Sequence, residues 1–201
     1  MNEPTEKHAI RRLLRERLAA MSDAERNARS IRACNLIAAS PEFAMARVVM
    51  LFLSTPSEIE TAPLALKCWQ TGKTVAVPKV SWNQRRMLPT EITSLHGLTT
   101  GERGIREPVG GKPVPVEFLD LVIVPGLGFT ADGHRIGRGM GFYDRFLAQN
   151  EFIGLSCGLA FETQIVPSLP VLDHDMPLSM LVTDWGIRRF ASNCIQPAVG
   201  G

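Results

Sequence analysis

The sequence predicts an α/β fold, a single domain with a mainly parallel sheet and helices on both faces. Short continuous runs of apolar residues, typical of buried parallel strands, alternate along the chain with segments of helical periodicity. Polar or glycine-rich segments follow two of these runs, at the strand ends where such sheets bind ligands. The chain has 201 residues, and we expect residues 1–201 to form one domain around one core.

The N-terminal region is expected to hold two helices and a strand. Residues 6–21 carry an apolar stripe at helical spacing, opposite a face rich in lysine and arginine. Ser22 and Glu25 form a capping-box pattern, so a second helix should run to about Ala39, with Pro41 ending it. Residues 48–53 are continuously apolar, as in a buried strand. The stripe of the first helix consists of Ile10, Leu13, Leu14, Leu18 and Met21.

The middle of the chain is less regular. Residues 61–71 look helical with Gly72 as the cap, and residues 74–78 form a short strand. Residues 80–117 hold several prolines and a glycine pair, so we expect one strand near Met87 and loops elsewhere.

The C-terminal half again alternates strands and helices. Residues 119–124 give the strongest strand signal, and a glycine-rich loop and a helix over 141–149 follow it. Residues 153–159 and 178–183 supply two further strands.

The most informative segment is Gly137-Arg138-Gly139-Met140-Gly141-Phe142-Tyr143-Asp144. Glycines at alternate positions allow a close backbone approach to a ligand, and successive N–H groups ahead of a helix bind anions. Arg135 and Arg138 suit phosphate oxygens, and Asp144 suits a magnesium ion beside them. These residues predict a nucleotide phosphate site.

The glycine spacing excludes two familiar phosphate motifs. The third glycine comes one residue too early for a dinucleotide fingerprint, and no Gly-Lys-Ser/Thr tripeptide of a Walker A loop occurs. Taken alone, the three glycines fit a tight turn with solvated arginines equally well. The adjoining Phe142-Tyr143-Asp144 and the upstream Pro-Gly-Leu-Gly-Phe at 125–129 favour a binding site.

The overall composition of the chain indicates which classes of binding partner and which cellular compartment to expect. The formal net charge is +2, so we expect no nucleic-acid partner, and no apolar run approaches the ~18 residues of a membrane helix. The N-terminus lacks a hydrophobic signal core. The four cysteines are far apart, which fits reduced thiols in a cytoplasmic protein. We expect a monomer. These cysteines are Cys34, Cys68, Cys157 and Cys194.

Four separated motifs together resemble the 5-formyltetrahydrofolate cyclo-ligase family, also called 5,10-methenyltetrahydrofolate synthetases, over nearly the whole chain. The first is the basic N-terminal helix with Lys7-x-x-x-Arg11, and the second is Phe52-Leu53-Ser54 through Glu58-Ile59-Glu60-Thr61. The third runs from Pro125 to Asp144, and the fourth is His174-Asp175-x-Pro177 with Val182-Thr183.

The resemblance implies that ATP and 5-formyltetrahydrofolate react to give 5,10-methenyltetrahydrofolate, ADP and phosphate, with Mg²⁺ as cofactor. Glu58 would anchor the pterin and Leu53 would line its pocket, while Asp144 and Asp175 would hold Mg²⁺. Arg138 and Tyr143 would be the catalytic residues. The implied ATP-binding residues are Lys7, Arg11, Arg135, Ile136, Gly137, Arg138, Gly139, Met140, Gly141, Phe142 and Tyr143.

Each role has a plainer alternative. The face with Lys7 and Arg11 could simply be solvated, Leu53 could be strand core, and Asp175 could be a turn residue beside Pro177. Asp144 could stabilise a helix start. His174 has no second histidine nearby, which argues against a transition-metal site.

Two residues depart from the family pattern. Met140 stands where many members have lysine, which removes one phosphate contact, and Phe142 replaces a more common tyrosine. Two other functions compete with the implied one: a phosphate-ester or CoA-type enzyme of similar architecture, and a nucleotide-binding regulatory module without catalysis.

Overall fold

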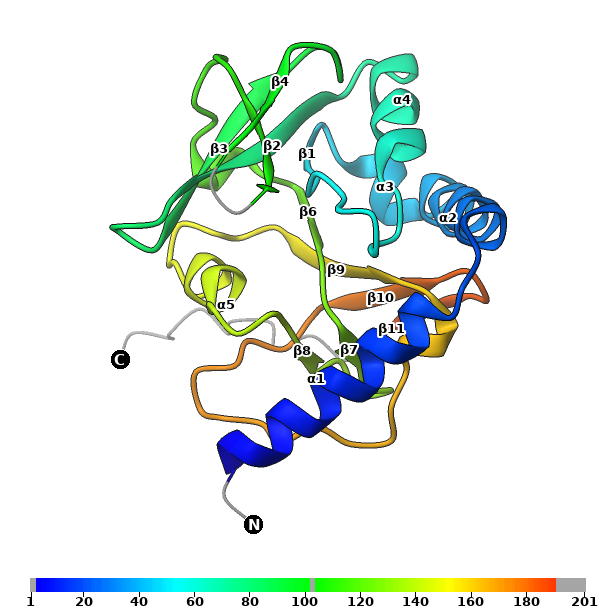
Figure 1. Cartoon of the computed structure of the whole chain (residues 1–201). Helices are drawn as coiled ribbons and strands as arrows, with labels where there is room; N and C mark the ends of the chain where they lie inside the picture. The colour runs from blue at the N-terminus through cyan, green and yellow to red at the C-terminus, as the bar shows by residue number, and fades with distance from the viewer. Residues whose placement is uncertain (1–2, 102–103, 191–201) are drawn as a thin grey trace, which may run out of the picture.

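A seven-stranded sheet runs through the middle of the molecule (Figure 1). This computed structural model describes residues 3–101 and 104–190. The sheet strands are β1 (Val48–Met50), β2 (Thr74–Ser81), β3 (Arg86–Ile92), β6 (Leu121–Val124), β9 (Leu155–Ala160), β10 (Met180–Thr183) and β11 (Ile187–Arg189). Two small antiparallel pairs lie outside it: β4 (Leu98–Thr100) with β5 (Arg106–Pro108), and β7 (Gly128–Phe129) with β8 (Arg135–Ile136).

The topology confirms the predicted α/β class with its mainly parallel sheet. The strand order is β11-β10-β9-β6-β1-β2-β3, in which β10, β9, β6, β1 and β2 are mutually parallel and the two edge strands are antiparallel. From β1 the chain builds outward to β2 on one side and later to β6 on the other. The order therefore reverses between β1 and β6, and such a switch point opens a crevice at the carboxyl ends of the strands.

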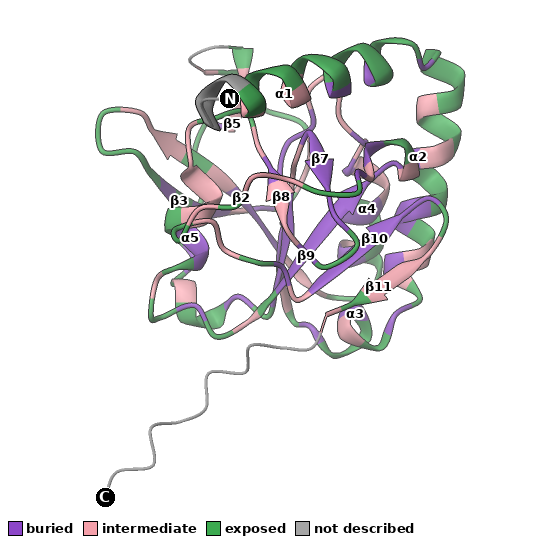
Figure 2. Ribbon diagram, turned by 90° about the horizontal axis from the view of Figure 1, so that it is seen from below, coloured by how far each residue is buried: buried purple, intermediate pink, exposed green. Residues whose placement is uncertain are grey.

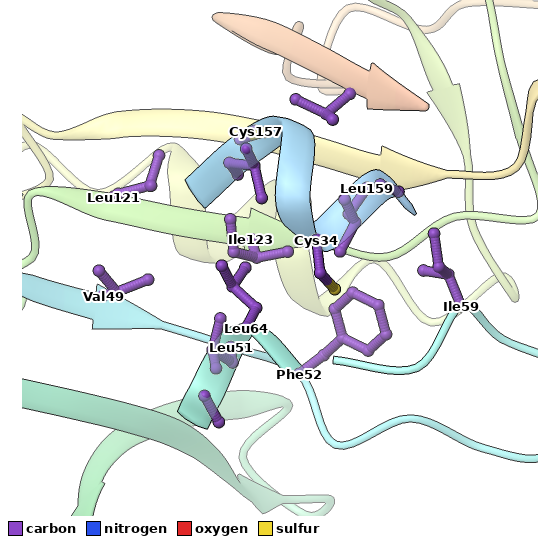
Figure 3. Packing of buried hydrophobic residues seen from close by; sticks show 14 of the residues in the cluster. Cys34, Val49, Leu51, Phe52, Ile59, Leu64, Leu121, Ile123, Cys157 and Leu159 are labelled. Atoms are coloured by element: carbon purple, nitrogen blue, oxygen red, sulfur yellow. The ribbon is translucent and has the colours of Figure 1, made fainter. Parts of the chain in front are cut away.

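The helices cover both faces of the sheet, as predicted. Alternate residues of a strand face opposite sides. Val49 and Ile123 belong to a core with residues of α2 and α4, whereas Met50 and Val122 belong to a second core with residues of α5. Figure 3 shows side chains of the first core, and Figure 2 shows the buried strands between helices with exposed outer faces. The helices are α1 (Glu3–Ala19), α2 (Asp23–Ala38), α3 (Pro41–Met45), α4 (Ala62–Gln70) and α5 (Phe142–Leu147).

The first two helices form largely as predicted. Ser22 caps α2 by accepting a hydrogen bond from the Glu25 N–H at 3.2 Å. Leu14 and Leu18 of α1 are buried, but the expectation that Leu13 joins their stripe is wrong, since Leu13 is 45% exposed. Successive helical residues lie about 100° apart, which turns Leu13 away from the narrow stripe that packs on the core.

Other boundaries differ from the sequence prediction. Pro41 does not simply end a helix, because it occupies the first turn of α3, where its missing N–H costs nothing. Only Val48–Met50 of the run 48–53 is strand, although Leu51 to Leu53 remain buried. Residues 80–117, expected to be mostly loops, contain β3, β4, β5 and the 3₁₀ turn η2 (Val116–Phe118).

The remaining C-terminal elements follow the predicted order with shifted ends. The expected helix over 141–149 is the shorter α5, and a β7–β8 hairpin stands between β6 and the glycine-rich loop. A second 3₁₀ turn, η3 (Glu162–Gln164), follows β9. Three of the cysteines are buried free thiols, and Cys194 lies outside the described residues. Within the described ranges, no helix has the length and apolarity needed to span a bilayer.

Candidate active site

A cavity of about 610 Å³ opens at the switch point, beyond the carboxyl ends of β1 and β6. Its walls come from α1, the loops after β1 and β6, the β2–β3 hairpin, the glycine-rich loop and the segment 172–175. The structure therefore brings every candidate residue of the sequence analysis to one place. These are Lys7, Arg11, Leu53, Glu58, Arg135, Ile136, Gly137, Arg138, Gly139, Met140, Gly141, Phe142, Tyr143, Asp144 and Asp175.

The glycine-rich loop owes its shape to two glycines and two arginines. Gly139 and Gly141 have φ values of 106° and 62°, in the left-handed region that favours glycine. Arg11 donates from Nε to the Gly137 carbonyl at 3.0 Å, and Arg145 donates to the Met140 carbonyl at 2.6 Å. These bonds fix the loop by its carbonyl groups. The helix after it has only six residues, so its dipole adds less positive potential than the sequence suggested.

Arg135 forms the buried part of one wall. Its side chain is 4% exposed and donates to Asp144 Oδ1 and to the Met176 carbonyl, both at 2.7 Å. Burial lowers the pKa of Arg135, while the charges of Asp144 and Asp175 act in the opposite direction. The guanidinium stays charged, because arginine does not deprotonate in proteins. Both carboxylates thus lie close to the same cation.

Asp175 joins this wall to the N-terminal helix. Lys7 Nζ donates to Asp175 Oδ2 at 3.0 Å, and the Leu172 N–H donates to the same oxygen at 2.9 Å. Burial acts to raise the pKa of Asp175, but these two donors, together with the charges of Lys7 and His174, outweigh it, so the pKa lies below its ordinary value. Asp175 is therefore ionised at neutral pH, with the Lys7 ammonium as its partner.

Glu58 stands on the opposite wall with both carboxylate oxygens bonded. Oε2 accepts from the N–H and the hydroxyl of Thr55 at 2.9 and 3.0 Å. Oε1 accepts from Arg138, whose Nη2 lies 3.2 Å away. Arg138 also donates to the hydroxyls of Thr55 and Ser57 at 2.9 and 3.2 Å. Arg138 thus bridges the glycine-rich loop to the loop after β1.

Tyr143 presents an unpaired hydroxyl at the cavity. Its oxygen is buried, and no hydrogen-bond partner lies within reach among the described residues. Burial, followed by the negative charge of Glu58, raises the pKa of Tyr143, so the phenol stays protonated. A buried donor without a partner suits a ligand oxygen.

The acidic residues fit a hard cation in part. Mg²⁺ is commonly held by one or two carboxylates together with substrate phosphates and water. Asp144 and Asp175 provide two such carboxylates around Arg135. Within residues 3–101 and 104–190, no three His, Cys, Asp or Glu side chains form a metal cluster. The protein alone therefore offers a partial coordination shell.

Sequence reasoning missed the apolar wall of the cavity. Trp82 and Met87, from the β2–β3 hairpin, line it, and the Trp82 ring meets Phe142 edge-on at 5.2 Å between centroids. Arg106 also lines it and donates to the Ser54 carbonyl at 3.1 Å. The sequence prediction placed a short strand over 74–78 and another near Met87, with a loop between them, and did not pair the two strands as a hairpin.

Comparisons with known proteins find relatives over most of the chain. Residues 3–184 match the model of the 5-formyltetrahydrofolate cyclo-ligase family. The chain is 31% identical to 5-formyltetrahydrofolate cyclo-ligase of Mus musculus, over 85% of this chain and 89% of that protein. It is also 31% identical to the enzyme of Escherichia coli K12, over 85% and 96%. The NMR structure of Aquifex aeolicus 5,10-methenyltetrahydrofolate synthetase is 29% identical, with a TM-score of 0.81 over 97% and 96% of the two chains.

Proposed function

The chain belongs to the 5-formyltetrahydrofolate cyclo-ligase family, and we propose which residues of its cavity bind ATP, Mg²⁺ and the folate. It catalyses the ATP-dependent cyclisation of 5-formyltetrahydrofolate to 5,10-methenyltetrahydrofolate and is a ligase of folate metabolism. Family membership leaves the phosphate-ester enzyme and the non-catalytic regulatory module without support. The individual roles that follow rest on the contacts of the cavity.

The chemistry requires activation of a poor leaving group. The formyl group on N5 is an amide, so its oxygen does not leave readily. Transfer of the γ-phosphoryl group of ATP to that oxygen releases ADP and creates a phosphate leaving group. N10 then attacks the formyl carbon and loses its proton, and the C–O bond breaks to release phosphate. Such a transfer depends on positioning and on neutralising charge.

The phosphates of ATP would bind the wall built from α1 and the glycine-rich loop. Lys7 and Arg11 lie on one face of α1, four residues apart, and both line the cavity beside this loop. With the Gly137 and Met140 carbonyls held by arginines, the N–H groups from Ile136 to Gly141 would donate to phosphate oxygens. Arg138 would leave Glu58 and neutralise the transferred phosphoryl group.

Asp144 and Asp175 would hold Mg²⁺ together with the triphosphate. Their oxygens are hard ligands, and two protein carboxylates plus phosphates and water complete the usual magnesium shell. The bound ion would neutralise phosphate charge during the transfer. Arg135 keeps Asp144 in position, and Lys7 does the same for Asp175.

The folate would occupy the other side of the cavity. Glu58 would accept hydrogen bonds from the pterin amino group and ring N–H at Oε1, the oxygen that Arg138 contacts here. Leu53, which is 8% exposed, would pack on the pterin. Tyr143 lines the same cavity, and its hydroxyl, which has no hydrogen-bond partner among the described residues, would donate to the formyl oxygen as it is phosphorylated.

One observation supports this arrangement most: a single cavity is lined by several cationic residues, by Glu58 and by Tyr143, whose buried hydroxyl has no partner in the described part of the chain. The test is to incubate the protein with 5-formyltetrahydrofolate and MgATP and to follow methenyl absorbance in the near ultraviolet. Absorbance should rise with all components and stay flat when ATP or Mg²⁺ is omitted. A full rate in EDTA would contradict the magnesium assignment.

A further inference from the structure

Helix α2 holds the loop that carries Glu58 from behind. Three of its side chains, four residues apart and so on one face, bond to the backbone of residues 57–60. Arg26 Nη1 donates to the Ser57 carbonyl at 3.4 Å, and Ser30 Oγ accepts from the Glu60 N–H at 3.0 Å. Cys34 Sγ donates to the Glu60 carbonyl at 3.4 Å. Cys34 shares its buried core with Phe52, just before the loop (Figure 3).

Arg26 also ties this loop to the helix on the phosphate side. Its Nη2 donates to the carbonyls of Leu18 and Met21, each at 3.1 Å, where α1 ends. Carbonyls at a helix end lack intrahelical partners, and a guanidinium satisfies them well. One half-buried side chain thus links the end of α1 to the loop after β1.

Ser57 lies between two arginines. Its carbonyl accepts from Arg26 behind the loop, and its hydroxyl accepts from Arg138 on the cavity side. Arg138 is the residue proposed to move to the phosphate. Once it does so, the tip of the loop loses that contact with the glycine-rich loop, while the bond to Arg26 remains available.

We infer that Arg26 is a positioning residue for folate binding, acting through Glu58. By holding the Ser57 carbonyl, it keeps the neighbouring Glu58 carboxylate directed into the cavity after Arg138 has turned away. This inference rests on the proposed pterin contact of Glu58. Ser30 supports the same loop, since its buried hydroxyl fixes the Glu60 N–H.

The test measures binding of 5-formyltetrahydrofolate and of MgATP separately by calorimetry. Arg26→Gln should raise the Kd for 5-formyltetrahydrofolate about tenfold, as expected for one lost charged hydrogen bond, and leave the Kd for MgATP within about twofold. Arg26→Lys keeps the charge but not the forked geometry, and should recover part of the affinity. Arg32→Gln, on the same helix with an exposed side chain, is the matched control and should change neither Kd.

The decisive comparison adds Arg26→Gln to Glu58→Gln. If Arg26 acts through Glu58, the second substitution should cause little further loss of folate affinity. An undiminished effect in the double variant, or equal losses for both ligands, would overturn the inference. Should Arg26→Gln fail to fold, Arg26→Lys carries the same comparison. Failure of the proposed function looks different, because Glu58→Gln alone would then leave folate binding unchanged.

Discussion

Two arginines three residues apart in the chain line the same cavity but differ in burial and in hydrogen bonding. Arg135 is 4% exposed and locked onto Asp144 and the Met176 carbonyl. Arg138 is 47% exposed and reaches across the opening to Glu58. A buried guanidinium bonded to a carboxylate and a carbonyl holds a fixed wall, whereas an exposed one can change partners at little cost. The difference separates a residue that shapes the site from one that can move during the reaction.

Replacement of Arg135 should have the largest effect on stability. Arg135→Gln removes the partner of Asp144 and leaves the carboxylate partly buried without its counter-charge. Breaking such a pair costs about 3–5 kcal/mol of the free energy of unfolding. Urea denaturation followed by circular dichroism measures this loss.

Arg138→Gln provides the matched control in the same loop. Its exposed pair with Glu58 should contribute less than about 1 kcal/mol to stability. Equal losses for the two variants would mean that the distinction between fixed and exchangeable arginines does not hold.

The same Arg138→Gln variant should lose catalysis instead. If Arg138 neutralises charge on the transferred phosphoryl group, its removal should lower kcat by about 10²-fold, as for one preorganised donor. Steady-state rates at saturating ATP and 5-formyltetrahydrofolate check this. A normal kcat with only a raised KM for ATP would assign Arg138 to ground-state binding.

Glu58→Gln should separate the folate side of the cavity from the phosphate side, because it should affect the binding of one ligand only. Loss of the charged acceptor should weaken 5-formyltetrahydrofolate binding by about 2 kcal/mol and leave MgATP binding nearly unchanged. Isothermal titration of each ligand measures both values. Weaker ATP binding with normal folate binding would place Glu58 on the phosphate side.

The smallest expected effect is on how the free energy of unfolding changes with pH, through Asp175. The pKa of Asp175 in the folded protein lies below its ordinary value of 3.8. A lowered pKa adds stability above the ordinary value, and that stability is lost as the pH falls through the folded value. Wild type should therefore lose its advantage over Asp175→Asn on acidification below pH ~4. Unfolding curves at several pH values test this, and a constant difference would contradict it.

Local patterns predicted the class of fold and the glycine-rich part of the cavity, whereas the other cavity residues were predicted from the family resemblance. Continuous apolar runs marked β6 and β10, and alternate glycines marked the turns at Gly139 and Gly141. The errors arose where tertiary packing overrode local signals. Leu13 is apolar but lies on an exposed side of its helix, and two of the prolines in 80–117, Pro89 and Pro108, lie within strands β3 and β5.

The partners of the site residues could not be predicted in the same way. Arg138 and Glu58 are 80 residues apart, and Arg26 and Ser57 are 31 apart. No local pattern links such pairs, because the path of the chain between them sets the contact. That the Tyr143 hydroxyl has no partner within residues 3–101 and 104–190 likewise follows from the packing of distant segments around it, which no local pattern gives.

The ion pair between Lys7 and Asp175 has a consequence for the order of biosynthesis. The two residues are separated by 168 positions, so a ribosome adding about 5–20 residues per second makes the second about 8–34 seconds after the first. Strand β1 likewise pairs with β6 only after β6 has been made, since Val49 of β1 pairs with Leu121 of β6. Helix α1 therefore emerges with its cationic face before its acidic partner exists, and this wall of the cavity is complete only after Asp175 has been made.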